Sequence, residues 1–348
     1  MSGVQMIVVE EGDTDQRLDR WLRRLFPHVS QGRIEKMCRK GELRVDGGRV
    51  KANTRVEAGQ TVRVPPLPSA DHKPQEPRER RISDADAKMI RDCVIYRDDE
   101  VIVLNKPAGL AVQGGSGTTK HVDGLAAALC FDYEEKPRLV HRLDKDTSGV
   151  LVLARTRLAA QALTSAFRHH ATRKIYWALV AGVPTPYLGE IKTGLVKAGG
   201  HGSKGEGEKM VLVHPEDIKD TPGAKRAHTV YSTLYRVAGR ASWVAMEPIT
   251  GRTHQLRVHM NGIGHPIVGD GKYGGSGQEN LGDGWGAQLG GVISKKLHLH
   301  ARSMTFEHPK TKKSIIVKAE LPPHMKESWD TFGWSEDLAD DDPFEKLQ

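Results

Sequence analysis

The sequence is poor in cysteine and contains no long apolar run. Its three cysteines, Cys38, Cys93 and Cys130, lie far apart, so their spacing fits neither a disulfide framework nor a zinc knuckle. No stretch approaches the roughly 20 apolar residues that a membrane-spanning helix requires. The first residues include Glu, Asp and Gln and no apolar core, so we expect no signal peptide. These shortages predict a cytoplasmic protein of a reducing compartment that contacts no membrane.

Acidic residues are also fewer than basic ones. The 348 residues include 52 Lys and Arg against 44 Asp and Glu, which gives a net charge of +8. Residues 335–348 alone carry −5, so the rest of the chain carries +13. Basic surfaces attract polyanions because each neutralised phosphate releases counterions. The charge therefore favours a nucleic acid partner, although many proteins without one are mildly basic. We expect residues 328–348 to form a solvated acidic tail.

Residues 15–64 have the pattern of a small folded module. Four apolar residues recur at helical spacing, namely Leu18, Trp21, Leu22 and Leu25. They predict a first helix that faces one core. Ser30 is a suitable N-cap and Gly41 a suitable stop for a second helix. Two adjacent glycines after that helix, at positions 47 and 48, predict a hairpin turn.

The second helix and the loop after it carry basic side chains that are candidates for RNA binding. They are Arg33, Lys36, Arg39, Lys40 and Arg44. Charged groups spaced along a helix edge can follow an RNA backbone, whereas a solvated helix face is the simplest alternative. Residues 65–90 contain five prolines and many charges, which predicts a flexible linker. Residues 91–327 are then expected to form the second domain.

The most informative segment is formed by residues 141–154. Its polar first half includes His141, Arg142 and Asp144, and it leads into an apolar run that predicts a buried strand. A loop at the end of a buried strand holds polar groups rigidly, as a catalytic carboxylate requires. A turn in which Asp144 and Thr147 bond their own backbone is an equally weighted alternative.

The sequence His141-Arg142-Leu143-Asp144, followed by Thr147-Ser148-Gly149, resembles the signature of the RluA-type pseudouridine synthases, and within them the RluC/RluD branch. Other segments of the chain are also similar and stand in the family's order, at residues 105–109, 113–117, 169–180, 251–259, 264–270 and 297–301. Residues 15–64 resemble an S4 RNA-binding domain. The resemblance implies an α+β protein. It would join a small S4 (α-L) domain to a synthase domain built on a mixed, mainly antiparallel bent sheet with flanking helices.

The resemblance also implies roles for individual residues. Asp144 would be the catalytic carboxylate, Tyr176 would lie against the target base, and Arg257 would pair with Asp144 and keep it ionised. Arg142, with His141 beside it, would contact RNA and occupy the space left by a flipped base. The sequence pattern by itself favours a packing role for a strand tyrosine such as Tyr176.

The implied activity converts uridines of 23S ribosomal RNA into pseudouridines, by flipping the base and then breaking and re-forming its glycosidic bond. The reaction adds no group and changes no oxidation state, so no cofactor is expected. No metal is expected either, because His298 and His300 lack an accompanying Cys or Glu ligand set. The expected enzyme is a monomer that binds 23S RNA or the assembling large subunit. We expect its choice of 23S RNA substrate to resemble that of the RluC type rather than that of the RluD type. Transfer RNA is the less favoured substrate. Whether Asp144 attacks C1′ or removes a C2′ proton stays open.

Two other functions compete with this one. A basic chain with an S4-like module could serve as a non-enzymatic ribosome-assembly factor, which would need none of Asp144, Tyr176 or Arg257. A nucleoside hydrolase would release free uracil. Two glycine-rich stretches, at residues 194–226 and 274–290, are read as surface loops, the first with a possible RNA contact.

Overall fold

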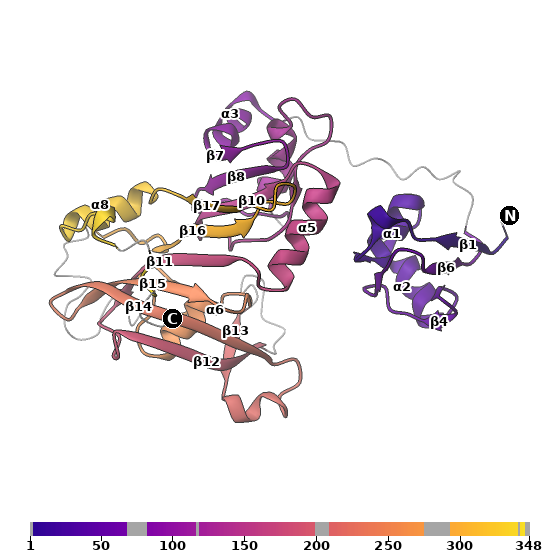
Figure 1. Cartoon of the computed structure of the whole chain (residues 1–348). Coiled ribbons are helices and arrows are strands. Elements are labelled where there is room, and N and C mark those ends of the chain that lie inside the picture. Colours follow the sequence, from indigo (N-terminus) through magenta and orange to yellow (C-terminus); the bar gives the residue numbers. More distant parts are fainter. Residues whose placement is uncertain are drawn as a thin grey trace. The chain divides into compact units, whose positions relative to one another are not determined.

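The computed structural model describes residues 3–67, 82–115, 118–198, 209–274, 293–339 and 342–344. The chain folds into two compact units, residues 1–81 and 82–348 (Figure 1). No helix among the described residues combines the length and the apolar character needed to cross a membrane.

The first unit packs two helices, α1 (Leu18–Leu25) and α2 (Gln31–Lys40), against small sheets. Its strands are β1 (Gln5–Val8), β2 (Gln16–Arg17), β3 (Arg44–Val45), β4 (Gly48–Arg49), β5 (Arg55–Val56) and β6 (Thr61–Val64). The larger sheet has the order β1-β6-β3-β4. Since β1 precedes the predicted start at residue 15 and pairs with β6, the unit begins earlier than expected.

The helix signals of the first unit are largely confirmed. The Ser30 hydroxyl accepts a hydrogen bond from the Arg33 amide at the start of α2. Gly41 ends α2 in the left-handed conformation, with φ of 70°. Leu18 is fully buried, as the spacing predicts, but the side chain of Leu25 is 40% exposed. Leu25 is the last residue of α1, where the buried face of the helix runs out.

The predicted linker, residues 65–90, is too long at both ends. Leu67 is buried in the core of the first unit. Helix α3 (Asp84–Asp92) belongs to the second unit and begins at Ser83, whose hydroxyl caps it. Ile90 of α3 is fully buried in the core of the second unit. The local composition is too polar to predict this helix, because the stability of the helix depends on contacts with distant strands. Residues 68–81 lie outside the described residues.

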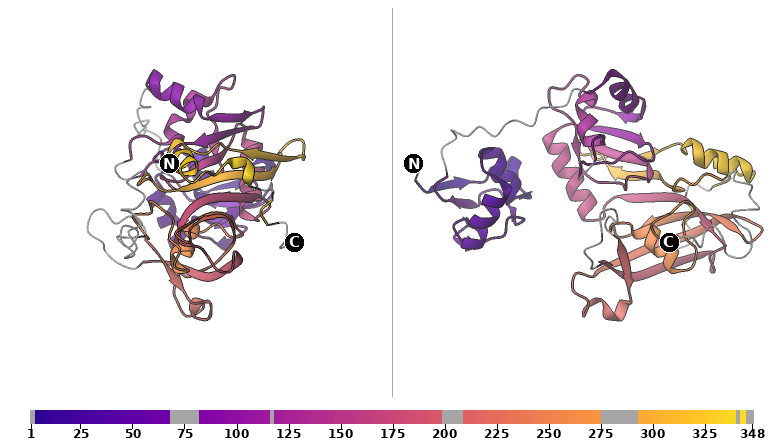
Figure 2. Two further views of the ribbon diagram at one scale, coloured as in Figure 1. Left: turned by 90° about the vertical axis from the view of Figure 1, so that its left-hand side faces the viewer. Right: turned by 180° about the vertical axis from the view of Figure 1, so that it is seen from behind.

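The second unit is built on one large mixed sheet with helices packed on it (Figures 1 and 2). Its strands are β7 (Val94–Arg97), β8 (Val101–Lys106), β9 (Arg138–Leu139), β10 (Ser148–Ala154), β11 (Arg173–Ala181), β12 (Leu188–Lys197), β13 (Met210–Val213), β14 (Lys225–Val237), β15 (Ala241–Pro248), β16 (Leu299–Glu307) and β17 (Ser314–Lys318). The other helices are α4 (Val122–Leu125), α5 (Arg157–Arg168), α6 (Gln255–Gly262) and α8 (Pro323–Thr331).

The order of the main sheet is β13-β12-β14-β15-β11-β16-β10-β8-β7, with β17 beside β16 and β9 beside β10. Strands β10 and β16 run parallel, and the other pairs of described strands in this sheet are antiparallel. The expected mixed, mainly antiparallel sheet with flanking helices is therefore confirmed.

The apolar run after residues 141–147 forms β10, and every one of its seven residues is buried. Val150 and Val152 pack against α5, whereas Leu151 and Leu153 pack in the core on the opposite face, which also contains Ile90. A strand covered on both faces needs apolar side chains on both, so the sequence is continuous rather than alternating. The strand thereby gives residues 141–147 a rigid base.

The parallel contact between β10 and β16 depends on Gly149. Its φ is +106°, a conformation that side chains disfavour, and a Cβ there would lie 2.2 Å from the Ala301 carbonyl oxygen. Glycine is therefore required next to residues 141–147, where two strands from distant parts of the chain meet.

The expectation of a solvated tail from residue 328 is wrong for the residues that the structure describes. The aromatic rings of Trp329, Trp334 and Phe344 are buried in a core with Trp243. Asp342 accepts two hydrogen bonds of 2.7 Å from the Arg173 guanidinium. Aromatic residues thus fix the segment, and its acidic residues form ion pairs that a local charge count does not reveal.

The two predicted surface loops have different outcomes. The stretch 194–226 contains the end of β12, all of β13 and the start of β14, so much of it is sheet rather than loop. Residues 199–208 within it lie outside the described residues, as do residues 275–292, which include nearly all of the second stretch.

Candidate active site

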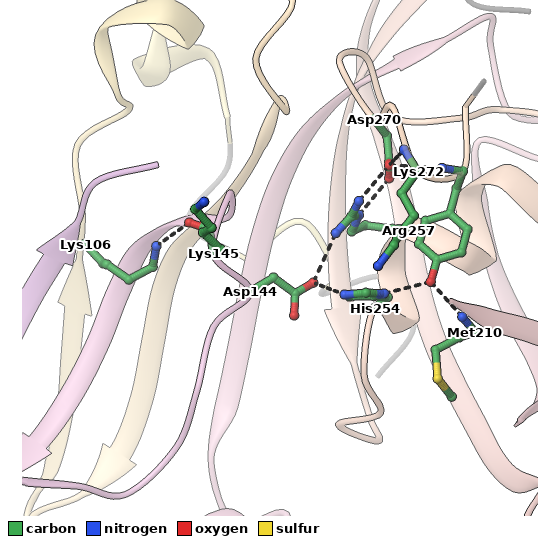
Figure 3. Close-up of polar contacts among 9 residues, drawn as sticks. Lys106, Asp144, Lys145, Met210, His254, Arg257, Asp270 and Lys272 are labelled. Carbon is green, nitrogen blue, oxygen red and sulfur yellow. Dashed lines mark hydrogen bonds and ion pairs between the residues drawn. The ribbon is translucent and has the colours of Figure 1, made fainter. Parts of the chain in front are cut away.

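Asp144 lies in the loop that precedes β10, and a buried lysine fixes the backbone beside it. Lys106, the last residue of β8, is fully buried. Its ammonium group donates hydrogen bonds of 2.8–3.0 Å to the carbonyl oxygens of Pro107, Leu110 and Lys145. Burial lowers the pKa of Lys106 to about 8, against the opposing effect of Asp146 and Asp144. The three bonds tie the loop after β8 to the loop that contains Asp144, and Figure 3 shows the bond to Lys145.

Asp144 also lines a cleft of about 520 Å³, which we call the Asp144 cleft. Residues from five separate segments of the chain surround it. They include Gln113, Arg142, Phe167, Tyr176, Arg252, His254, Arg257 and Leu299. The structure thus brings together the residues for which the sequence predicts catalytic roles, although Asp144 and Arg257 are far apart in the chain.

Arg257 contacts Asp144, but a different carboxylate holds it more tightly. Its Nη1 atom lies 3.6 Å from Oδ2 of Asp144. Its Nε and Nη2 atoms donate hydrogen bonds of 2.8 and 2.7 Å to the two oxygens of Asp270. Burial tends to lower the pKa of Arg257, but Asp270 outweighs it and the pKa is raised. The predicted ion pair with Asp144 is therefore present, and Asp270, a further partner that the sequence argument missed, orients the guanidinium.

His254 is a second contact of Asp144 that the sequence argument missed. Its Nε2 atom lies 3.8 Å from Oδ2 of Asp144, and its Nδ1 atom lies 2.7 Å from the Tyr273 hydroxyl oxygen. The residue has φ of 52° at the start of α6. Because this left-handed residue precedes α6, helical spacing does not relate His254 to Arg257, and no sequence signal indicates that both contact Asp144.

The hydrogen bonds of Tyr273 determine which nitrogen of His254 carries the proton. The Tyr273 hydroxyl oxygen accepts a hydrogen bond of 3.0 Å from the Met210 amide. Burial lowers the pKa of His254, while Asp144 opposes that effect, so the ring is neutral near pH 7. The hydroxyl proton of Tyr273 can then point to Nδ1, which leaves the ring proton on Nε2. Figure 3 shows that His254 contacts Asp144.

Tyr176 projects from β11 into the Asp144 cleft and remains a phenol at neutral pH. Burial, together with the negative charge of Asp144, strongly raises the pKa of its hydroxyl group. The ring packs against the apolar clusters below the cleft, and Trp177 points to the opposite face, as the alternation predicts. An undissociated phenol is a poor base, so the geometry suits a ring that supports a base rather than one that removes a proton.

His141 and Arg142 occupy different environments. The His141 ring stacks on Phe167 with centroids 4.3 Å apart, and its Nε2 atom accepts a 2.9 Å hydrogen bond from the Val152 amide. Burial lowers the pKa of His141 to about 3, so the ring is neutral. His141 thus supports the loop, and because it also lines the Asp144 cleft, its contact with RNA stays a prediction. Arg142 is exposed at the cleft, 3.4 Å from the Gln113 amide oxygen.

The predicted RNA-binding residues of the first unit differ in the ion pairs and hydrogen bonds that they form within that unit. Arg33 and Lys40 each lie 3.8 Å from the Glu42 carboxylate. Arg44 donates hydrogen bonds to the carbonyl oxygens of residues 41 and 47 and so closes the hairpin. Lys36 and Arg39 are exposed on α2, which makes them the more accessible pair.

The spacing of His298 and His300 suggests a metal site, but their ring nitrogens form hydrogen bonds within the fold. His298 lies 2.8 Å from both the Lys296 carbonyl oxygen and the Ser328 hydroxyl. His300 lies 2.8 Å from the Ser148 hydroxyl and 3.1 Å from the Ala319 carbonyl oxygen. Burial lowers the pKa of His298 to about 4 and that of His300 to about 3. Both rings therefore brace β16 as neutral groups.

Comparison with known proteins agrees with this geometry. Residues 100–262 match the RNA pseudouridylate synthase family, and residues 16–62 match the S4 domain. The chain is 35% identical over 326 residues to ribosomal large subunit pseudouridine synthase C of Vibrio cholerae serotype O1, covering 93% of this chain and 96% of that protein. The protein of the same name from Escherichia coli O6:H1 is 34% identical over 93% of this chain and 95% of that protein.

A solved structure is also similar. Human RNA Pseudouridylate Synthase Domain Containing 4 is 29% identical, with a TM-score of 0.54, over 71% of this chain and 95% of that chain. The match to the catalytic loop, the arrangement of Asp144 with Arg257 and the similarity to these proteins lead to one conclusion. The chain belongs to the RluA-type RNA pseudouridylate synthases, which are isomerases, and it carries an S4 domain.

Proposed function

We propose that this chain isomerises specific uridines of large-subunit (23S) ribosomal RNA to pseudouridines. The observation that carries the proposal is the position of Asp144, which lines one cleft with Tyr176 and lies 3.6 Å from the Arg257 guanidinium. The names of the relatives from Vibrio cholerae and Escherichia coli support the choice of large-subunit RNA. Such a substrate implies that the protein works in the cytoplasm, on free RNA or on assembling subunits.

The contacts of Asp144 distinguish its two oxygens. Arg257 and His254 both approach Oδ2, at 3.6 and 3.8 Å. These two groups stabilise the negative charge and fix the carboxylate rotamer. Oδ1 makes no hydrogen bond to any of the described residues, and we assign it as the atom that reacts with the substrate sugar. The same atom would serve whether Asp144 attacks C1′ or removes a C2′ proton.

The remaining residues of the cleft prepare the substrate. The reacting atoms of a stacked uridine are inaccessible, so the nucleotide must be flipped out, at a cost of a few kcal/mol. Arg142 stands exposed at the cleft and would fill the space that the base leaves. Tyr176 would then hold the uracil while the N1–C1′ bond breaks, the base turns, and the C5–C1′ bond forms. The C5 proton is lost and N1 gains one, so no cofactor is required.

We propose that the protein acts as a monomer, because one chain supplies the carboxylate, the tyrosine ring and the guanidinium that the reaction requires. The S4 domain would dock on RNA through Lys36 and Arg39, with smaller contributions from Arg33, Lys40 and Arg44. This docking requires no chemistry, so substitutions there should weaken RNA binding without abolishing turnover at saturating RNA.

The test is tritium release from 23S RNA that carries [5-³H]uridine, with the wild type, Asp144→Asn and the control Asp132→Asn compared. Asp132 is an exposed carboxylate outside the cleft. We expect release by the wild type and the control only, followed by mapping of the modified positions. Turnover by Asp144→Asn would refute the assignment of the carboxylate. Tight binding of RNA and of assembling subunits without any release would favour the assembly factor, and free uracil would favour the hydrolase.

A further inference from the structure

A second cavity, of about 640 Å³, adjoins the Asp144 cleft and shares Asp144, His254 and Arg257 with it. Tyr176 lines only the first of the two spaces, so the second lies on the side of Asp144 away from the base support. Four lysines from three separate segments line it, namely Lys145, Lys272, Lys295 and Lys296. We call this space the lysine cavity.

The lysine cavity has a strong excess of positive charge. Among the described residues that line it, five are cationic, the four lysines and Arg257, and two are carboxylates, Asp144 and Asp146. His254 is neutral near pH 7 because burial lowers its pKa. Several ammonium groups around one concave space repel each other, and an anion that enters between them relieves this repulsion.

The backbones that carry these lysines are held in place. The Lys145 carbonyl oxygen accepts hydrogen bonds from the buried Lys106 ammonium group and from the Gly109 amide. Lys296 approaches Gly269 so closely that a Cβ at Gly269 would lie 2.0 Å from the Lys296 carbonyl oxygen. Gly269 also has φ of +76°, so the contact requires glycine. The fold therefore fixes the backbone of the cavity at Lys145 and Lys296.

The chemistry of the lining indicates which anion it takes. Two backbone amides of the lining already donate within the fold, that of Gly109 to Lys145 and that of Lys272 to Asp270. The positive charge of the described lining comes mainly from lysines, which act as flexible point charges without the directed fork of arginine. Such groups suit the phosphates of a nucleic acid backbone, and they carry no preference for a particular base.

We infer that the lysine cavity binds the backbone phosphates next to the flipped uridine; this inference rests on the proposed function. With the uracil at Tyr176 and the C1′ atom of the ribose at Oδ1 of Asp144, the ribose lies where the two spaces meet. The chain of the RNA then leaves the site on the lysine side. The cavity thereby holds the sugar at Asp144 from one side while Tyr176 holds the base from the other.

The first test compares two pairs of lysines. Lys295→Gln/Lys296→Gln removes two charges from the cavity, and the control Lys312→Gln/Lys313→Gln removes two exposed charges from the β16–β17 turn. We expect the cavity variant to raise KM for RNA about tenfold with kcat nearly unchanged. The slope of log KM against log salt should fall by about 0.7 for each lost contact to single-stranded RNA. Lys295→Arg/Lys296→Arg should restore KM, which separates lost charge from a damaged fold.

The second test removes the charge from the RNA instead. A short RNA containing one mapped target uridine is made with an uncharged methylphosphonate at the linkage on either side of it. At one of the two linkages, the methylphosphonate should weaken binding by the wild type as much as the lysine substitutions weaken binding of the unmodified RNA. The cavity variant should bind the modified and the unmodified RNA equally well, because both changes remove the same contact. Fully additive losses at both linkages, or an equal rise in KM in the control pair, would overturn the inference. Failure of the proposed function would show separately, as absence of tritium release by the wild type.

Discussion

The buried pair of Arg257 and Asp270 allows stability and catalysis to be separated in one experiment. Asp270 is 1% exposed, and its two oxygens accept hydrogen bonds of 2.8 and 2.7 Å from Arg257. Oδ1 of Asp270 also accepts from the amides of Lys272 and Tyr273. Asp270→Asn keeps the shape of the side chain but turns its amide group, a hydrogen-bond donor, toward the Nε–H of Arg257. It also leaves a buried guanidinium without its closest counter-charge.

The expected cost follows from these contacts. Loss of one partner of a buried ion pair destabilises a protein by about 3–5 kcal/mol. For a unit of this size, that loss lowers the melting temperature by roughly 10 °C. Asp144→Asn should cost under about 1 kcal/mol, because Asp144 is partly exposed and its contacts with Arg257 are longer than hydrogen bonds. The order is reversed for activity: Asp144→Asn should abolish tritium release, whereas Asp270→Asn should only reduce kcat.

Urea unfolding and tritium release on the same preparations test this reasoning. The double variant Asp270→Asn/Arg257→Gln is the control, and it should recover part of the lost stability because no unpaired charge stays buried. If Asp144→Asn destabilises the protein as much as Asp270→Asn does, then Asp144 is the principal partner of Arg257. The assignment of Asp270 as the group that orients the guanidinium would then be refuted.

Three further outcomes are expected. Tyr273→Phe removes the hydroxyl group that orients the His254 ring, so kcat should fall about tenfold with KM unchanged, whereas an effect on KM alone would contradict the assigned proton position. Burial lowers the pKa of His141 to about 3, below its value of roughly 6.5 in the unfolded chain. The unfolded state then binds more protons in acid, so this contribution to stability is complete above about pH 6.5 and is lost as pH falls, by about 2 kcal/mol at pH 5. Denaturant melts at pH 7 and pH 5 should show a smaller difference for His141→Asn than for the wild type, and equal differences would argue against the buried neutral ring. Gly149→Ala should prevent the pairing of β10 with β16 and yield little folded protein, and a soluble variant with a wild-type melting temperature would contradict the close approach to Ala301.

The local sequence determined several features of this protein without help from the tertiary structure. The N-cap at Ser30, the left-handed stop at Gly41 and the buried strand after the catalytic loop each depend on residues close together in the chain. Strand alternation likewise assigned Tyr176 and Trp177 to opposite faces. Such features follow from backbone geometry and side-chain period, which act over a few residues. The resemblance of the motif at Asp144 to a known family supplied the chemistry that these patterns do not contain.

Only the tertiary structure decided how the site is held together. Asp270 and Tyr273 follow α6 in the chain, and nothing in their immediate neighbours shows that they bind Arg257 and His254. The folded end of the chain is similar, because Asp342 finds its partner in the distant residue Arg173. These pairings exist because the sheet brings separate segments to one place and removes their charges from water. A charged residue that the local sequence predicts to be solvated then becomes a fixed member of an ion pair in the fold.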